Sequence, residues 1–171
     1  MTMAGLTMAG WIASLALAPP MQAGAATPCT PPPLPAALAG WEPGVAVAAG
    51  TGAAGAPMLT IGGGARATLV ATNTLRYAHA PDKAAAPGSF GGLFAFTVAR
   101  AGRYRVALGG GAWIDVVQGD RALISVAHDH GPACSPIRKM VDFDLTPGRY
   151  LLQVSGSKTR ALPLMVATVA R

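Results

Sequence analysis

Two segments of the chain share the pattern that decides its fold: "FTVARAGRYRVAL" at 96–108 and "FDLTPGRYLLQV" at 143–154. Each contains an alternating run, a tight turn that ends in Gly-Arg-Tyr, and a second alternating run. Successive side chains of a β-strand point to opposite faces, so alternation places one set in the core. We therefore predict two hairpins, whose inward-facing residues are Tyr104, Val106 and Leu108 in the first and Tyr150, Leu152 and Val154 in the second.

Short apolar or alternating runs continue on both sides of these segments and are separated by turn residues. The 171 residues include 22 Gly and 15 Pro, a punctuation that favours short strands over long helices. We expect strands at 45–49, 57–61, 66–72, 92–99, 103–109, 112–118, 121–128, 138–145, 149–155 and 162–170. Together they predict an all-β fold: a single antiparallel β-sandwich or jelly-roll-like domain, with the loop at 79–92 as a rim or mobile lid.

The N-terminus carries the features of an export signal. Residues 6–18 form an apolar run of signal-peptide length, too short to span a bilayer, and small residues follow near Ala25 and Ala26, where cleavage is expected. We therefore predict a signal peptide at 1–25, a proline-rich arm at 26–44 and the β-sandwich at 45–171. The mature chain is expected in the periplasm or outside the cell, without a transmembrane span.

The two cysteines, Cys29 and Cys134, fit an exported protein. In an oxidising compartment an even pair of cysteines predicts a disulfide. Such a bond would pin the proline-rich arm across the domain, where Trp41 could close one edge of the core.

The charge of the chain argues against one class of partner. Its formal net charge of +6 comes from 13 Lys and Arg residues against 7 Asp and Glu residues. The basic residues are scattered, without a polybasic run and without interleaved stacking aromatics, which nucleic-acid-binding surfaces use. We expect no nucleic-acid partner.

The stretch "SVAHDHGPACSPIRK" at 125–139 is the first candidate for a functional site, because it holds two of the three histidines. The strand expected at 121–128 has the inward-facing residues Ala122, Ile124 and Val126. Alternation then puts His128 and His130 on this same face, at the end of the core.

Two imidazoles at this spacing can bind one divalent transition metal ion, but the site needs a third ligand. His79, in the long loop, is the first choice, and Asp115 and Asp129 are further candidates. Two alternatives stay open for these histidines: hydrogen bonding at a strand end, or a partly exposed ligand-binding or proton-responsive rim.

Nucleophilic catalysis has weaker support, and no catalytic residue is assigned. Ser125 and His128 should face opposite sides of their strand, although a catalytic triad requires them to meet. The thiol of Cys134 could act as a nucleophile only if it were reduced.

The run "AWIDVV" at 112–117 gives a second candidate site. Trp113 and Asp115 share a face of the expected strand. On an exposed face they could bind a sugar by stacking and hydrogen bonding. In the alternative, Trp113 belongs to the core and a buried Asp115 needs a hydrogen-bond donor.

Two family resemblances accompany these patterns. The segments "ARAGRYRVAL" and "LTPGRYLLQV" resemble secreted bacterial β-sandwich modules of the pre-peptidase C-terminal type, which implies the same fold. The longer run from Ala112 to Gly156 resembles short exported bacterial proteins that often carry the label homogentisate 1,2-dioxygenase. That label implies ferrous iron held by two His and one Glu. Glu42, in the arm, is the only Glu of the chain, so this triad has no residue-by-residue match here.

These observations lead to two functional hypotheses. The first is an exported, non-enzymatic module that binds a small molecule or an envelope component, with no assured cofactor. The alternative is a metal-binding protein or metal-dependent enzyme with a site around His128 and His130.

Overall fold

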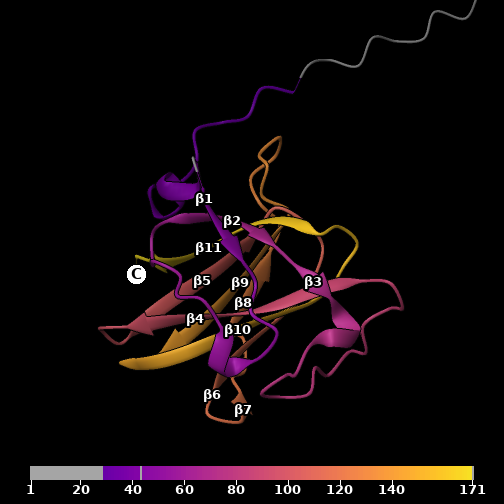
Figure 1. The fold of residues 1–171 in the computed structure, drawn as a ribbon. Helices are drawn as coiled ribbons and strands as arrows, with labels where there is room; N and C mark the ends of the chain where they lie inside the picture. Colours follow the sequence, from indigo (N-terminus) through magenta and orange to yellow (C-terminus); the bar gives the residue numbers. More distant parts are fainter. Residues whose placement is uncertain (1–28, 43, 171) are drawn as a thin grey trace, which may run out of the picture.

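The computed structural model describes residues 29–42 and 44–170, which form two β-sheets packed face to face (Figure 1). The strands are Val45–Ala48 (β1), Gly64–Thr68 (β2), Val70–Ala71 (β3), Phe90–Val98 (β4), Gly102–Leu108 (β5), Trp113–Gln118 (β6), Arg121–Ala122 (β7), Ala127–Asp129 (β8), Lys139–Leu145 (β9), Gly148–Ser157 (β10) and Ala161–Val169 (β11). Short 3-10 helices span Ala36–Trp41 (η1), Ala53–Gly55 (η2) and Thr72–Thr74 (η3). The predicted signal peptide at 1–25 lies outside the described residues.

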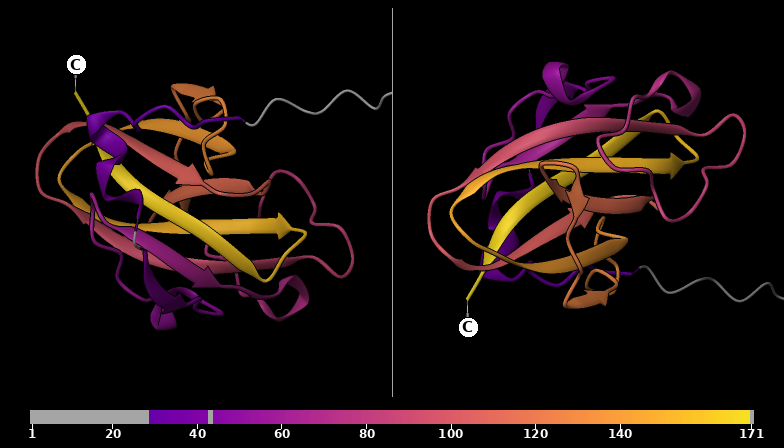
Figure 2. Two further views of the ribbon diagram at one scale, coloured as in Figure 1. Left: turned by 90° about the horizontal axis from the view of Figure 1, so that it is seen from above. Right: turned by 90° about the horizontal axis from the view of Figure 1, so that it is seen from below.

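The two sheets confirm the predicted all-β sandwich. One has the strand order β1-β2-β11-β5-β9-β8 and the other β3-β4-β10-β6-β7. Among the described strands, β1 and β2 pair parallel, and the remaining neighbours pair antiparallel. Views from above and below show the strands in two layers, with the long connections at the ends and edges (Figure 2).

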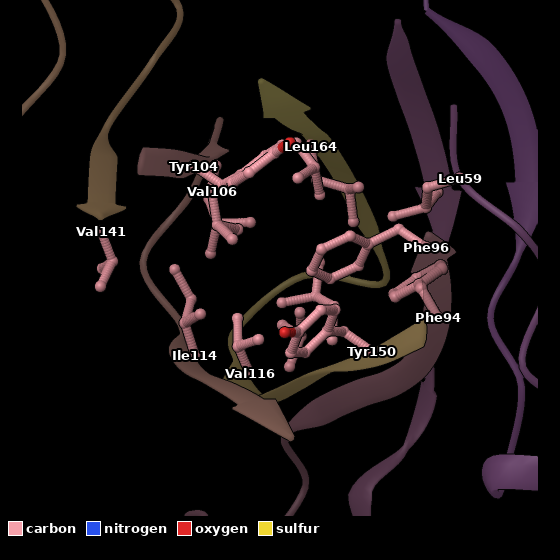
Figure 3. Close-up of a cluster of buried hydrophobic side chains, with 14 of the residues drawn as sticks. Leu59, Phe94, Phe96, Tyr104, Val106, Ile114, Val116, Val141, Tyr150 and Leu164 are labelled. Atoms are coloured by element: carbon pink, nitrogen blue, oxygen red, sulfur yellow. The ribbon is translucent and has the colours of Figure 1, made fainter. Parts of the chain in front are cut away.

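Apolar side chains fill the space between the sheets. The inward-facing residues predicted for the two repeated segments are all confirmed, and each is at most 5% exposed. At the centre, the rings of Phe96 and Tyr150 stack with their centroids 5.6 Å apart (Figure 3). Burying a large apolar side chain contributes about 1.5–3 kcal/mol, so this cluster is the main source of stability.

The predicted pairing within each repeated segment is wrong. Each tight turn carries the chain from one sheet to the other: β4 leads into β5, and β9 leads into β10. The two segments pair with each other instead, β4 with β10 and β5 with β9. Phe96 thus lies opposite Tyr150 in one sheet, and Phe143 lies opposite Tyr104 in the other.

The tyrosine after each turn fixes the corner between the sheets. The hydroxyl of Tyr104 donates a hydrogen bond to the carbonyl of Arg100, and that of Tyr150 donates to the carbonyl of Thr146, each at 2.8 Å. Both carbonyls lie four residues earlier in the chain. These bonds resemble the tyrosine corner of other β-sandwiches, where a buried ring reaches back to the turn that precedes it.

The strand predicted at 121–128 is also wrong, because the chain changes sheets within it. Leu123 N–H bonds to the carbonyl of Val116 in β6, whereas Val126 N–H bonds to that of Asp142 in β9. The segment therefore splits into β7 in one sheet and β8 in the other. Ile124, predicted to face the core, is 90% exposed at this crossing.

A smaller correction concerns residues 57–61, which form no strand. Met58 makes a single isolated bridge with Ala95 of β4. Pro57 precedes it and has no N–H to donate, which prevents a continuous ladder.

The N-terminal arm lies across the outer face of the larger sheet, as its cysteine predicts. Trp41 in η1 is 3% exposed and belongs to a separate apolar cluster. The cluster consists of Leu38, Trp41, Ala107, Ile137, Met140, Met165 and Ala167. A disulfide between Cys29 and Cys134, whose Cα atoms lie 5.6 Å apart, joins the arm to the connection before β9.

Candidate ligand-binding site

Strand β6 places Trp113 and Asp115 together on the outer face of the smaller sheet. Ile114 and Val116, which alternate with them, lie in the core. The indole Nε1 of Trp113 donates a 2.9 Å hydrogen bond to Oδ1 of Asp115. The predicted shared face is therefore confirmed, and the carboxylate restrains the orientation of the ring.

Asp115 has an incomplete set of hydrogen bonds. The residue is 8% exposed, and its Oδ2 atom is buried without a hydrogen-bond partner in the described part of the chain. Burial is the main cause that raises the pKa of Asp115, and the charge of Asp82 adds to it. The bond from Trp113 and the charges of His79 and Lys139 act in the opposite direction. A buried acceptor of this kind favours a bound donor, such as a ligand hydroxyl or a water molecule.

The other sheet contributes Lys139, the first residue of β9. Its ammonium group donates a 2.8 Å hydrogen bond to the carbonyl of Ala112 and lies 5.5 Å from the centroid of the Trp113 ring. Burial lowers the pKa of Lys139, the positive charge of Lys83 lowers it further, and Asp115 opposes both effects. Trp113 is thus held between a carboxylate and an ammonium group that come from different sheets.

A loop between η3 and β4, the magenta segment beyond β3 in Figure 1, covers this face. Gln153 of β10, opposite Asp115 in the sheet, is 1% exposed and binds the loop backbone. Its Oε1 accepts hydrogen bonds from Ala78 N–H and His79 N–H at 2.7 and 3.2 Å, and its Nε2 donates to the His79 carbonyl at 2.9 Å. One buried amide therefore fixes the predicted rim loop onto the sheet.

Tyr77, in the same loop, adds a second buried polar atom. Its hydroxyl has no hydrogen bond of good geometry among the described residues. Burial is the main cause that raises the pKa of Tyr77; the side chain of Ser155 lowers it in part, and the charge of Asp115 raises it. Asp115 in the sheet and Tyr77 in the loop thus each contribute a buried oxygen that makes no hydrogen bond of good geometry among the described residues.

An open pocket of ≈ 920 Å³ borders this cluster. Loop, strand and turn residues line it: Lys83, Ala84, Ala85, Ala86, Gly109, Gly110, Gly111, Ala112, Trp113, Lys139, Ser155, Gly156, Ser157, Lys158 and Thr159. A second opening of ≈ 570 Å³ shares Lys83 and the three following alanines. The first pocket is large enough for a small ligand.

His128 and His130 occupy other places than predicted, whereas His79 lies in the covering loop, as expected. His128 and His130 are both exposed, and they do not line the end of the core. His130 Nδ1 lies 3.2 Å from the carbonyl of Arg138, so the alternative of hydrogen bonding at a strand end is confirmed for this residue. His79 Nδ1 lies 3.0 Å from the carbonyl of Asp120, next to β7 of the smaller sheet.

The three histidines consequently do not form the predicted metal site. Within residues 29–42 and 44–170, no group of three His, Cys, Asp or Glu side chains could hold a metal ion. Cys134 is in the disulfide, so its thiolate is not a ligand or a nucleophile in this state. Ser125 lies in the exposed crossing between β7 and β8.

Three members of the site were missed by sequence analysis: Lys139, Gln153 and Tyr77. Lys139 lies over the Trp113 ring, Gln153 lies opposite Asp115 in the sheet, and Tyr77 lies within the influence of the Asp115 charge. All three come from distant parts of the chain, so no local spacing connects them with the Trp–Asp pair. Gln153 alternates with the inward-facing Leu152 and Val154, so the period of the strand puts it on the outward face, but alternation gives no sign that a loop covers that face.

Comparisons with known proteins leave the site as the basis for a functional argument. No family model matches the chain, and no curated protein or solved structure matches it either. The two resemblances noted from the sequence therefore stay predictions. In the described part of the chain, no helix is long and apolar enough to cross a membrane. Fold and site define a β-sandwich with a lysine-lined pocket beside a Trp–Asp pair.

Proposed function

We propose that this protein is an exported, non-enzymatic β-sandwich module of the periplasm or cell exterior. It binds a small polar molecule, or a saccharide part of an envelope component, in the pocket beside Trp113. Export rests on the apolar run at 6–18 and on the Cys29–Cys134 disulfide, which is typical of oxidising compartments.

The observation that carries this proposal is the fixed position of Trp113 at the edge of the pocket. Asp115 holds its indole nitrogen and Lys139 lies over its ring. Binding sites gain affinity when their contact groups are ordered before the ligand arrives. An aromatic ring beside hydroxyl and amine side chains also matches the usual composition of a site for a small polar ligand.

Tryptophan fluorescence tests the proposal directly. After signal cleavage the chain would contain Trp41 and Trp113, so the Trp41→Phe variant isolates the emission of Trp113. This variant is titrated with neutral, anionic and cationic monosaccharides. We expect a saturable change in emission for at least one class, and loss of binding by calorimetry in a Trp113→Ala variant.

The matched control is Trp41→Phe in the otherwise unchanged protein, because Trp41 lies in the arm cluster away from the pocket. Its calorimetric affinity should equal that of the wild type. Folded protein that shows no saturable binding to any of the three classes would overturn the proposal.

A further inference from the structure

The pocket beside Trp113 collects all the lysines of the chain. The sequence contains three lysines, and all three line this single opening. Lys83 comes from the covering loop, Lys139 from β9, and Lys158 from the turn between β10 and β11. None of the lining residues is an arginine, an aspartate or a glutamate. The basic side chains of the remaining chain are arginines, so the pocket differs chemically from the surrounding surface.

Lys139 makes no direct ion pair in the described part of the chain. It is partly buried, and its described contacts are a neutral carbonyl and the face of an indole ring. Burial lowers the pKa of Lys139, the negative charge of Asp115 raises it, and the positive charge of Lys83 lowers it. Like charges around one opening repel each other, and an anion between them would reduce this repulsion.

The rest of the lining fits a hydroxylated ring. Gly109, Gly110 and Gly111 form a wall without side chains, and a Cβ atom at Gly111 or Gly156 would meet nothing within 4 Å. Ser155 lies in the same wall, beside Trp113 in the sheet. These groups leave space for a ring beside the aromatic side chain of Trp113.

We propose that the ligand of this pocket is a small anion on a hydroxylated ring, a sugar acid or sugar phosphate, with its charged group among Lys83, Lys139 and Lys158. This inference rests on the proposed binding function and specifies the chemistry of its ligand. Ammonium groups bind carboxylates and phosphates as point charges, so both anions satisfy the site.

Calorimetry with matched ligands tests the charge requirement. Glucuronate and glucose 6-phosphate are compared with glucose, which has the same ring without the anion, and with inorganic phosphate, which has the anion without the ring. We expect both sugar anions to bind at least about tenfold more tightly than glucose or phosphate. If glucose binds as tightly as the sugar anions, the requirement for an anion is wrong, although the binding function stands. If inorganic phosphate binds as tightly as the sugar anions, the requirement for a ring is wrong.

Charge-removing variants locate the anion. Lys139→Met and Lys158→Met should each weaken glucuronate binding at least about fivefold, whereas Lys139→Arg, which keeps the positive charge, should retain most of the wild-type affinity. Arg138→Met is the matched control, since it removes one positive charge next to Lys139 in sequence but outside the pocket lining. If Arg138→Met weakens binding as much as Lys158→Met, the effect is the net charge of the protein and the proposed site is wrong.

Lysine NMR gives a readout that is independent of affinity. Protein labelled with ¹³C at lysine Cε yields three side-chain signals, assigned with the single variants. Glucuronate should shift all three, because they line one pocket. A ligand that binds but shifts none of them would place the anion elsewhere and overturn the inference.

Discussion

Trp113 donates its indole N–H to the carboxylate of Asp115, two residues later in the same strand, at a distance of 2.9 Å. The second oxygen of that carboxylate is buried without a partner in the described chain. The hydrogen bond therefore orients the Trp113 ring at the pocket and leaves Oδ2 of Asp115 as an acceptor without a partner in the described chain.

The Asp115→Asn variant tests the electrostatic cost of this arrangement. Burial raises the pKa of Asp115, so the folded state binds its proton more tightly than the unfolded state. The contribution of protonated Asp115 to the free energy of unfolding should be fully present below the ordinary pKa of 3.8. It should be lost as the pH rises through the raised pKa of the folded state. The asparagine variant lacks this titration. Urea unfolding of both proteins between pH 3 and pH 7 should show the wild type losing stability relative to the variant; a gain on raising the pH would contradict this expectation.

Gln153→Leu should release the loop that covers the site. The substitution removes three hydrogen bonds to the backbone at 78–79 and leaves part-buried amide groups unsatisfied. We expect a loss of about 1–3 kcal/mol of stability and faster hydrogen exchange at His79 N–H. Gln118→Leu, at an exposed glutamine of β6, is the control and should change neither quantity. Unchanged exchange in the Gln153 variant would show that the amide does not fix the loop.

Tyr104→Phe and Tyr150→Phe probe the two corners between the sheets. Each variant keeps the buried ring and removes one hydrogen bond to a turn carbonyl, so each should cost about 1 kcal/mol. Tyr77→Phe is the matched comparison, because its buried hydroxyl makes no hydrogen bond of good geometry among the described residues. That variant should be neutral or slightly stabilising. Equal losses in all three, measured by chemical denaturation, would mean that the corner bonds add nothing specific.

The disulfide is predicted to account for both cysteines of the chain. A thiol assay on denatured, unreduced protein should detect none, and the Cys29→Ser/Cys134→Ser variant should lose about 2–5 kcal/mol of stability. Cys29→Ser alone should lose about as much, since each single change already opens the ring. Two free thiols in the wild type would disprove the pairing.

Alternation predicted the core of this protein well and its connections poorly. The inward positions of the two Gly-Arg-Tyr segments follow from the period of a strand and the burial of apolar side chains. The same residues do not show whether a tight turn joins two neighbouring strands of one sheet or carries the chain into the other sheet. Both geometries need a short polar turn, and the choice between them depends on which distant strand supplies the partner.

The prediction of a continuous strand leading to His128 was wrong for a related reason. Apolar residues at Ile124 and Val126 have the spacing of a buried strand, but the chain exchanges β6 for β9 as its partner between them. Both side chains are exposed at this crossing, and so are His128 and His130, which follow it. The candidate site around Trp113 could be predicted only in part. The alternation of β6 predicts that Trp113 and Asp115 share a face, whereas Lys139 and the covering loop come from elsewhere in the fold.

The bond between Cys29 and Cys134 also determines how the molecule would respond to mechanical tension. The 105-residue separation of the two cysteines makes most of the sandwich a closed covalent ring. A pull on the N-terminal arm is transmitted through the sulfur atoms to the start of β9, bypassing every strand from β1 to β8. In single-molecule stretching, the enclosed residues would add roughly 350 Å of contour length after reduction, at about 3.3–3.6 Å per residue, and none before it.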